Sequence, residues 1–171
     1  MKISTKGEYG LRAMLYLGMQ ESGISVTSHQ IARHQGIPEP YLRQILSLLS
    51  KNGLIHSNRG PQGGHSLARP AEEISLRDIL VVLEGQLTSV DQILAQPCTI
   101  HVGTEYCALR EVFLDVKREV ERILAQRTLG DLARRQKKLV DEDIRVPLDL
   151  AATGQSETSK TGRSSLPILR E

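Results

Sequence analysis

The chain has 171 residues, of which 39% are hydrophobic and 25% charged, which is typical of a soluble globular protein with one compact domain or two small ones. No segment is long and apolar enough to span a bilayer, and the opening MKISTKGEYG lacks the apolar core of a secretory signal, so a cytoplasmic protein is expected. The charge is uneven: residues 1–70 carry eight Lys and Arg against three Asp and Glu, whereas residues 71–171 carry fourteen against seventeen. A basic first part is typical of a module that binds a polyanion.

Two helices are predicted before residue 37. The first is expected from about Gly7 to Gln20, because TKGE has the spacing of a capping box, with Thr5 as the cap and Glu8 as its partner. Ser28 is expected to cap a second, short helix, HQIARHQ, which stops at Gly36.

A third predicted helix, YLRQILSLLSKNG after Pro40, has two different faces. Its apolar residues recur at i, i+3, i+4 and i+7, and these should bury against the preceding helices: Leu42, Ile45, Leu46 and Leu49. The opposite face is polar and basic. A short helix, a corner at Gly36 and this amphipathic helix predict a helix-turn-helix, whose second helix fits the major groove of DNA. A plain three-helix bundle with a solvated face is the alternative.

The next segment, LIHSNRGPQGGHSLARP, predicts a β-hairpin with a glycine-rich turn and a returning strand at 65–68. A hairpin placed directly after a recognition-type helix is a wing. Arg59 and the amides of Gly63 and Gly64 would lie at its tip, where an Arg can enter a minor groove and bare amides can approach phosphates. Together with the basic first part, this segment favours DNA binding over an ordinary exposed hairpin.

Three further helices are predicted after the wing. Ser75 can cap LRDILVVLEG, and Thr128 can cap TLGDLARRQKKL. Between them, residues 107–126 have the strongest helical period of the chain, carried by Leu109, Phe113, Val116, Val120 and Ile123. Such an a/d seam on a helix about 30 Å long favours a dimerisation helix over packing against the first helix. Beyond residue 141, the Ser-, Thr- and Gly-rich composition predicts a flexible tail.

The segments IPEPYLRQILSLLSKNGLIHSNRGPQGGHSLAR and ISTKGEYGLRAMLYL carry a resemblance over about residues 1–140. The chain resembles a family of winged-helix regulators that includes the iron-sulfur cluster regulator, a nitric-oxide-sensing repressor and a cysteine-metabolism repressor. The most specific motif is RGPxGGxxLA after YLxQIL. The resemblance implies a mainly α fold with a small β-hairpin wing, and a homodimeric transcription factor that binds a near-palindromic operator in double-stranded DNA, usually as a repressor.

The resemblance also implies which residues contact DNA. Arg43 stands where some relatives have an acidic residue; an Arg donates to guanine, whereas a Glu accepts from cytosine, so a relative's operator should not be transferred to this chain. His65 replaces an aromatic residue that is common in the wing. The expected DNA-binding set is Ser28, Tyr41, Arg43, Gln44, Arg59, Gly63 and Gly64.

The only two cysteines of the chain lie in CTIHVGTEYC, directly before the predicted dimerisation helix. The family usually has three cysteines here; this chain keeps the last as Cys107, has His101 at the middle spacing and places Cys98 three residues earlier. A [2Fe-2S] cluster needs four ligands, and imidazole can replace thiolate on one iron. The resemblance implies Glu8 as the fourth, from the other subunit; Glu105 and His34 are weaker candidates.

Other uses of this loop stay open from the sequence. Cys98 and Cys107 could form a thiol switch without metal, the loop could hold a single zinc ion, or the cysteines could be bystanders in a regulator controlled by a partner protein or a small molecule. We expect no enzyme, because neither a nucleotide-binding glycine loop nor HExxH is present. A protein-interaction module that has lost DNA binding is the better rival.

The sequence thus predicts four parts. Residues 1–84 form the winged helix-turn-helix, 85–106 the sensor loop, 107–140 the dimerisation helix with the short helix after it, and 141–171 the tail.

Overall fold

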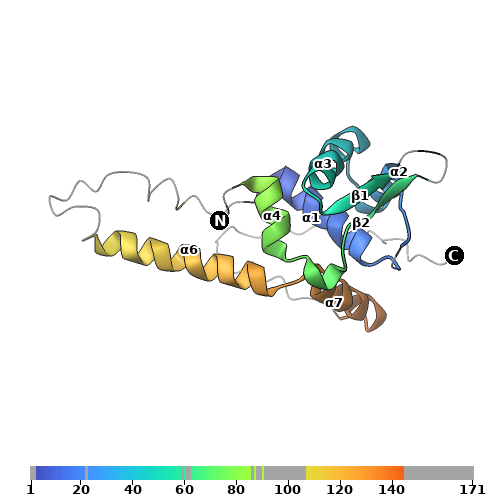
Figure 1. Ribbon diagram of the computed structural model, residues 1–171. Helices are drawn as coiled ribbons and strands as arrows, with labels where there is room; N and C mark the ends of the chain where they lie inside the picture. The colour runs from blue at the N-terminus through green and yellow to red at the C-terminus, as the bar shows by residue number, and fades with distance from the viewer. Residues whose placement is uncertain are drawn as a thin grey trace, which may run out of the picture.

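The order of helices and strands follows the sequence-based expectation, a mainly helical chain with one small hairpin. A computed structural model describes residues 3–21, 23–58, 60, 63–85, 87, 90 and 107–144 (Figure 1). Its elements are α1 (Thr5–Gly18), α2 (Ser28–Gln35), α3 (Glu39–Lys51), β1 (Ile55–Asn58), β2 (Gly64–Leu67), the 3-10 helix η1 (Ala71–Glu73), α4 (Leu76–Glu84), α6 (Ala108–Gln126) and α7 (Leu129–Asp141). Within these ranges, no helix has the length and hydropathy of a membrane span.

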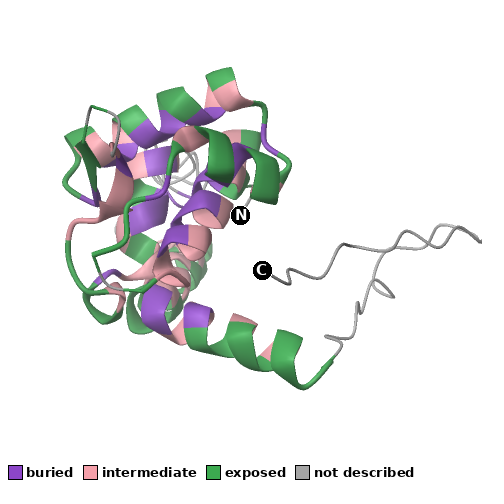
Figure 2. Ribbon diagram, turned by 90° about the vertical axis from the view of Figure 1, so that its right-hand side faces the viewer, coloured by how far each residue is buried: buried purple, intermediate pink, exposed green. Residues whose placement is uncertain are grey.

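The core lies where α1, α2, α3 and α4 face one another, and in Figure 2 most of the buried positions gather in this compact part of the ribbon. The predicted apolar stripe of α3 is confirmed: Leu42, Ile45, Leu46 and Leu49 are each at most 1% exposed. Gly36 ends α2 in the left-handed conformation, with φ of 61°, which a residue with a side chain rarely adopts. The helix-turn-helix geometry therefore follows from this turn and that stripe.

Two of the predicted helix caps are wrong. Ser4, not Thr5, caps α1: its Oγ accepts a hydrogen bond from the amide three residues later at 3.2 Å and donates to Glu84 Oε1 at 2.6 Å. Thr27, not Ser28, caps α2 and forms a full capping box. A cap needs an extended backbone, as Ser4 and Thr27 have, whereas Thr5 and Ser28 are already helical. Glu8 therefore has no capping role.

The hairpin is tied to the segment before α2. Strands β1 and β2 pair antiparallel, with Ser57 opposite His65 and Asn58 opposite Gly64. The backbones of His65 and Val26 exchange two hydrogen bonds, at 2.8 and 2.9 Å. A Cβ on Gly64 would lie 3.0 Å from the Val26 backbone, so the absence of a side chain at Gly64 permits this close approach. The wing is thereby fixed next to the start of α2.

The helices after the wing begin side by side. The predicted caps Ser75 of α4 and Thr128 of α7 are confirmed, each within a capping box. The two caps form an isolated β-bridge, in which the Leu76 amide donates to Arg127 and the Leu129 amide to Ile74, both at 2.8 Å. Leu129 is 1% exposed, which anchors the start of α7 in the core.

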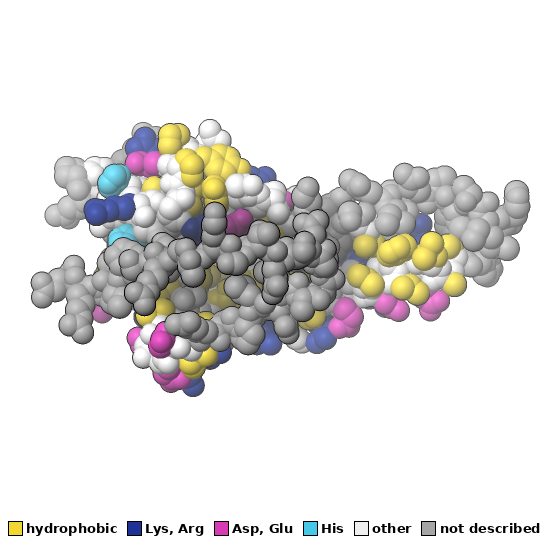
Figure 3. All heavy atoms as spheres, turned by 180° about the vertical axis from the view of Figure 1, so that it is seen from behind, with side chains coloured by type: hydrophobic (Ala, Val, Ile, Leu, Met, Phe, Trp, Pro, Cys, Tyr) yellow, Lys and Arg dark blue, Asp and Glu magenta, His cyan; other side chains and the backbone are white. Residues whose placement is uncertain are grey.

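Helix α6 extends away from this core (Figure 1), and none of its residues is buried. Leu109, Val116 and Ile123 are 62%, 46% and 51% exposed, and Figure 3 shows hydrophobic side chains gathered on this helix. Phe113 and Val120 are half-buried, and α6 contacts α4 rather than packing along α1. Two ion pairs, Asp115–Arg118 and Glu119–Arg122, lie along the helix, each at 2.7 Å. The predicted tail beyond residue 144 and most of the predicted sensor loop lie outside the described residues.

Candidate nucleic-acid interface

The outward face of α3 carries the residues predicted to read bases. Arg43 and Gln44 are exposed on the side of α3 opposite its buried stripe. Tyr41 is half-buried, and its ring packs edge-on against the ring of Tyr9 in α1, with 5.9 Å between the centroids. The structure thus brings Arg43 and Gln44 together on one free surface, while the ring of Tyr41 belongs partly to the packing between α1 and α3.

A cleft of about 320 Å³ separates α3 from the wing. Its walls come from three parts of the chain: the start of α2, the start of α3 and both strands of the hairpin with their turn. The residues that line it are Thr27, Ser28, His29, Glu39, Arg43, Asn58, Gly60, Gly63, Gly64 and His65. Four of the predicted DNA-binding residues, Ser28, Arg43, Gly63 and Gly64, therefore face the same hollow.

Glu39, in the first turn of α3, organises the charges of this cleft. Its Oε1 accepts a hydrogen bond from Arg43 Nη2 at 2.6 Å, and its Oε2 lies 3.2 Å from His29 Nδ1. The hydrogen bond from Arg43 and then that from His29 hold the pKa of the Glu39 carboxyl below its ordinary value. Glu39 is therefore ionised at neutral pH, and two basic side chains accompany the negative charge.

His65 joins the wing to the start of α2. Its Nε2 lies 3.0 Å from Ser28 Oγ and its Nδ1 lies 2.9 Å from Ser57 Oγ. Burial lowers the pKa of His65, so the ring is neutral at pH 7. In a neutral ring one nitrogen donates and the other accepts, so the two hydroxyls have complementary roles. Ser28, wrongly predicted as a cap, is thus held in the cleft by a side chain of the wing.

The turn of the wing uses one of its glycine amides internally. The Gly63 amide donates to the Gly60 carbonyl at 2.8 Å, so in this conformation it does not point at a ligand. Gly64 is buried against Val26. Arg59, predicted to enter the minor groove, lies outside the described residues. The expected phosphate contacts of Gly63 and Gly64 stay predictions.

The predicted metal ligands are described only in part. Cys98, His101 and Glu105 lie outside the described residues. Cys107 is half-buried at the N-cap of α6, and Glu8 is exposed on α1 with its Oε1 3.5 Å from Arg12 Nη1. The alternative ligand His34 stacks on Tyr16, with 5.2 Å between the ring centroids. Among the described residues, no three His, Cys, Asp or Glu side chains come together as a metal site.

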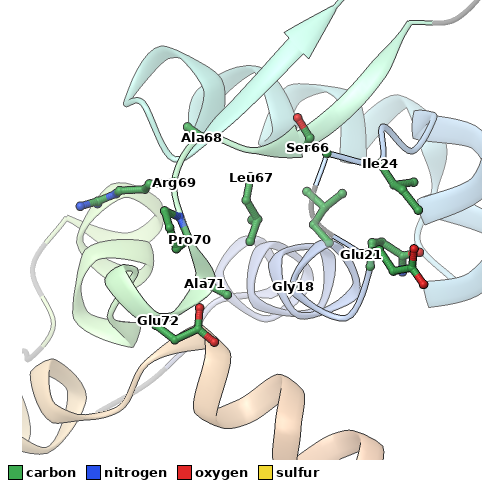
Figure 4. Close-up of a pocket in the computed structure, with 13 residues that line it drawn as sticks. Gly18, Glu21, Ile24, Ser66, Leu67, Ala68, Arg69, Pro70, Ala71 and Glu72 are labelled. Carbon is green, nitrogen blue, oxygen red and sulfur yellow. The ribbon is translucent and has the colours of Figure 1, made fainter.

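A second cavity, of about 440 Å³, lies between the end of α1, the end of β2 and η1 (Figure 4). Figure 4 shows Leu67 reaching from β2 toward α1. Glu72 on its wall pairs with Arg134 of α7 at 2.9 Å, and Arg69 pairs with Asp78 of α4 at 3.7 Å. Two of the charged side chains that line this cavity, Arg69 and Glu72, are thus used in ion pairs between elements of the fold.

Two polar side chains of the first cleft were missed in the sequence, Glu39 and His29. The four-residue spacing of Glu39 and Arg43 is a signal for their ion pair, because side chains at i and i+4 of a helix are neighbours. His29 has no such signal, since it comes from a different helix and meets Glu39 only in the folded chain.

Comparison with known proteins relates most of the chain to one group. A family profile described as "Rrf2: Iron-dependent Transcriptional regulator" matches residues 3–135. A chain of Mycobacterium tuberculosis that carries the name of an HTH-type transcriptional regulator is 38% identical over 133 residues, covering 78% of this chain and 81% of the relative. The HTH-type transcriptional regulator CymR of Bacillus subtilis is 35% identical, covering 78% and 90%. IscR of Serratia proteamaculans is 32% identical, covering 84% and 85%.

Comparison with solved structures relates the chain to the same group of regulators. The structure of CymR, the global cysteine regulator of B. subtilis, matches with a TM-score of 0.66 at 33% identity, covering 79% of this chain and 98% of that one. IscR of T. potens matches with a TM-score of 0.65 at 33% identity, covering 91% and 94%. The relatives are regulators of transcription, which confirms the expectation that the chain is not an enzyme.

Proposed function

Because the chain belongs to the Rrf2 family of transcriptional regulators, we propose that it is a homodimeric repressor that binds a near-palindromic operator and is controlled through the loop at residues 98–107. A DNA-binding fold and a role in transcription follow from the family. The dimer, repression, the contact residues, the four-part division of the chain and the signal are our proposals. The cytoplasmic location belongs with them, since a regulator must meet the chromosome.

The observation that carries the proposal is the exposed outer face of α3 beside the cleft under the wing. Arg43 and Gln44 project from a helix whose opposite side is locked into the core, so a rigid element presents them. In our proposal Arg43, Gln44 and Tyr41 contact the major groove, and Arg59 enters the minor groove. Ser28 and the glycines Gly63 and Gly64 are assigned to the DNA backbone, because they line the hollow between α3 and the wing. For Gly63 this assignment requires its amide to leave the Gly60 carbonyl when DNA binds.

The homodimer is supported by the exposed stripe of α6. Leu109, Val116 and Ile123 follow one another at seven-residue intervals, and each is more than 40% exposed in the single chain. A second copy of the same helix would cover this stripe, as in a coiled coil. Two-fold symmetry would then present two α3 helices to successive major grooves.

For the signal, a [2Fe-2S] cluster is the first candidate and a thiol switch the second. The donors Cys98, His101, Cys107 and Glu8 are two thiolates, one imidazole and one carboxylate, all of which can bind iron. Cys107 lies at the start of α6, where the helix dipole favours a thiolate. The family profile is called iron-dependent, which supports a signal through iron, and one matching CymR structure is described as an oxidized form, which supports a signal through oxidation.

Operator binding tests the proposed function. Affinity of the purified protein for duplex DNA should fall steeply between low and moderate salt, because phosphate contacts release counterions. Arg59→Ala should weaken operator binding by about tenfold while the dimer stays intact, as expected for one lost Arg contact in the minor groove. A protein that binds no duplex at low salt would instead be an interaction module.

The signal is tested on protein purified without oxygen. Visible absorption together with stoichiometric iron and sulfide would support the cluster, and His101→Ala should reduce both. A colourless, iron-free protein that binds its operator and responds to oxidant would reject the cluster and favour the thiol switch.

A further inference from the structure

We infer that Glu39 is a specificity-determining residue, which positions the Arg43 guanidinium so that the regulator requires guanine at the base that Arg43 reads. This inference rests on the proposed function, because it assumes that α3 enters the major groove. It concerns a residue that does not itself need to touch DNA.

The first observation is how the two side chains share the cleft. Glu39 and Arg43 are one helical turn apart, and the bond between Oε1 and Nη2 is short, at 2.6 Å. The Glu39 side chain is 27% exposed and that of Arg43 is 67% exposed, so the carboxylate is the inner partner and the guanidinium the outer one. His29 approaches the other carboxylate oxygen from α2 at 3.2 Å. The carboxylate is therefore held by two different helices.

The pair with Glu39 restricts the Arg43 guanidinium. An unrestrained Arg has many rotamers, and ordering it on a base costs conformational entropy. The bond to Glu39 orders Arg43 before DNA arrives. It uses one of five N–H donors, and the remaining donors suffice for the bidentate contact to guanine O6 and N7.

Binding to a DNA sequence without this guanine is disfavoured. DNA surrounds this face with phosphates, and a carboxylate there repels them. Glu39 is tolerated while Arg43 compensates its charge. At a base that Arg43 cannot contact, the guanidinium has two options. It either leaves Glu39, which breaks the ion pair, or keeps the ion pair and makes no hydrogen bond to the base. Discrimination then comes from rejecting other bases as well as from attracting guanine.

A purely structural role for Glu39 makes a different prediction. An acidic residue in the first turn of a helix is favoured by the helix dipole, and His29–Glu39 joins α2 to α3. If that were its whole purpose, its removal would change stability and not base preference. Base preference is therefore the readout that separates the two roles.

The experiment is selection of binding sites from a random duplex library, followed by affinity measurements on the selected site and its single-base variants. The proteins are the full-length wild type, Glu39→Gln, Arg43→Ala and the double variant. Glu142→Gln is the matched control, because it removes the same charge from another i, i+4 pair, with Lys138, that does not line the cleft. Thermal unfolding checks that each variant is folded.

The wild type should prefer guanine by about tenfold or more at the position that Arg43 reads, as a bidentate contact does. Glu39→Gln should reduce this preference about three- to tenfold and raise affinity for random duplex about twofold, because a repelling charge is lost. Glu142→Gln should change neither. In the Arg43→Ala background, Glu39→Gln should no longer affect base preference.

Two results would overturn the inference. One is an unchanged guanine preference in folded Glu39→Gln, whether or not its affinity changes, and the other is the same loss of preference when Arg43 is already absent. A wild type that binds duplex DNA without any base preference, or not at all, would instead reject the proposed function. The two failures are therefore distinguishable.

Discussion

Helices α3 and α6 have the same kind of apolar stripe but opposite surroundings. In α3, every residue of the stripe is buried, because α1, α2, α4 and β1 all contact this helix. Within the described part of the chain, α6 contacts mainly α4, and no residue of α6 is buried. A period of apolar residues thus predicts that a surface will be covered, and the rest of the fold decides whether the same chain covers it.

The difference has an energetic meaning. Burying a Leu or Val side chain contributes about 1.5–3 kcal/mol, and α3 gains this within one chain. Most of the stability of a helix in a protein comes from the packing of its apolar face against other elements. We therefore expect α6 to need a second apolar surface, whereas α3 buries its apolar stripe within one chain.

The largest effect on stability is expected from a substitution in the buried stripe of α3. Leu42→Ala leaves a cavity at a fully buried position, and we expect the free energy of unfolding to fall by about 2–5 kcal/mol in urea denaturation. Val140→Ala, at a position on α7 that is exposed, should cost less than about 0.5 kcal/mol. Similar losses in the two variants would mean that the α3 stripe is not the core.

The next largest effect is expected from substitutions in the exposed apolar stripe of α6. Replacing Val116 and Ile123 by Asp places two charges in the proposed dimer seam, and the dimer dissociation constant should rise about a hundredfold or more, equal to about 2.7 kcal/mol. Sedimentation equilibrium measures this constant, and the unfolding of α1–α4 should be unchanged. Ala125→Asp, exposed on the other side of α6, is the control. A double variant that remained dimeric would show that this stripe is not the seam.

The smallest effect is expected in the wing, which contains a titratable side chain, His65. Burial lowers the pKa of His65 below 6.5, so the unfolded chain takes up this proton at higher pH than the folded chain does. The contribution of His65 to stability is therefore complete above about pH 7. It is lost as the pH falls through 6.5 toward the folded pKa.

The slope stays below about 1.4 kcal/mol per pH unit, the limit for one proton. Urea denaturation between pH 5 and 8 measures it, and His65→Phe should remove this part of the pH dependence. If the wild type and His65→Phe lost stability in parallel, the wing histidine would not be the buried group.

What could be predicted from the sequence depended on how far apart the partners lie in the chain. The α3 stripe, the turn at Gly36 and the caps Ser75 and Thr128 were predicted correctly, because their signals are local. The cap of α1 was not, since Ser4 is selected partly by Glu84, eighty residues later. The cap of α2 is an exception, because it was missed although Thr27 and Gln30 form a local capping box.

The same limit applied to the candidate site. Arg43 was predicted from the polar face of α3 and from the family resemblance, and Gln44 from the resemblance alone; both are exposed. The link from His65 to Ser28 and the approach of His29 to Glu39 join separate elements, so no spacing predicted them.

The bridge between Ser75 and Thr128 closes the intervening 52 residues into a loop with a fixed base. The far end of this loop contains Cys107, and α6 connects it to the base as a rigid rod about 28 Å long. Because α6 is held at its C-terminal end, a small displacement of its N-terminal end would tilt the whole helix. In the proposed dimer, a chemical change near Cys107 would therefore change the angle between the two subunits.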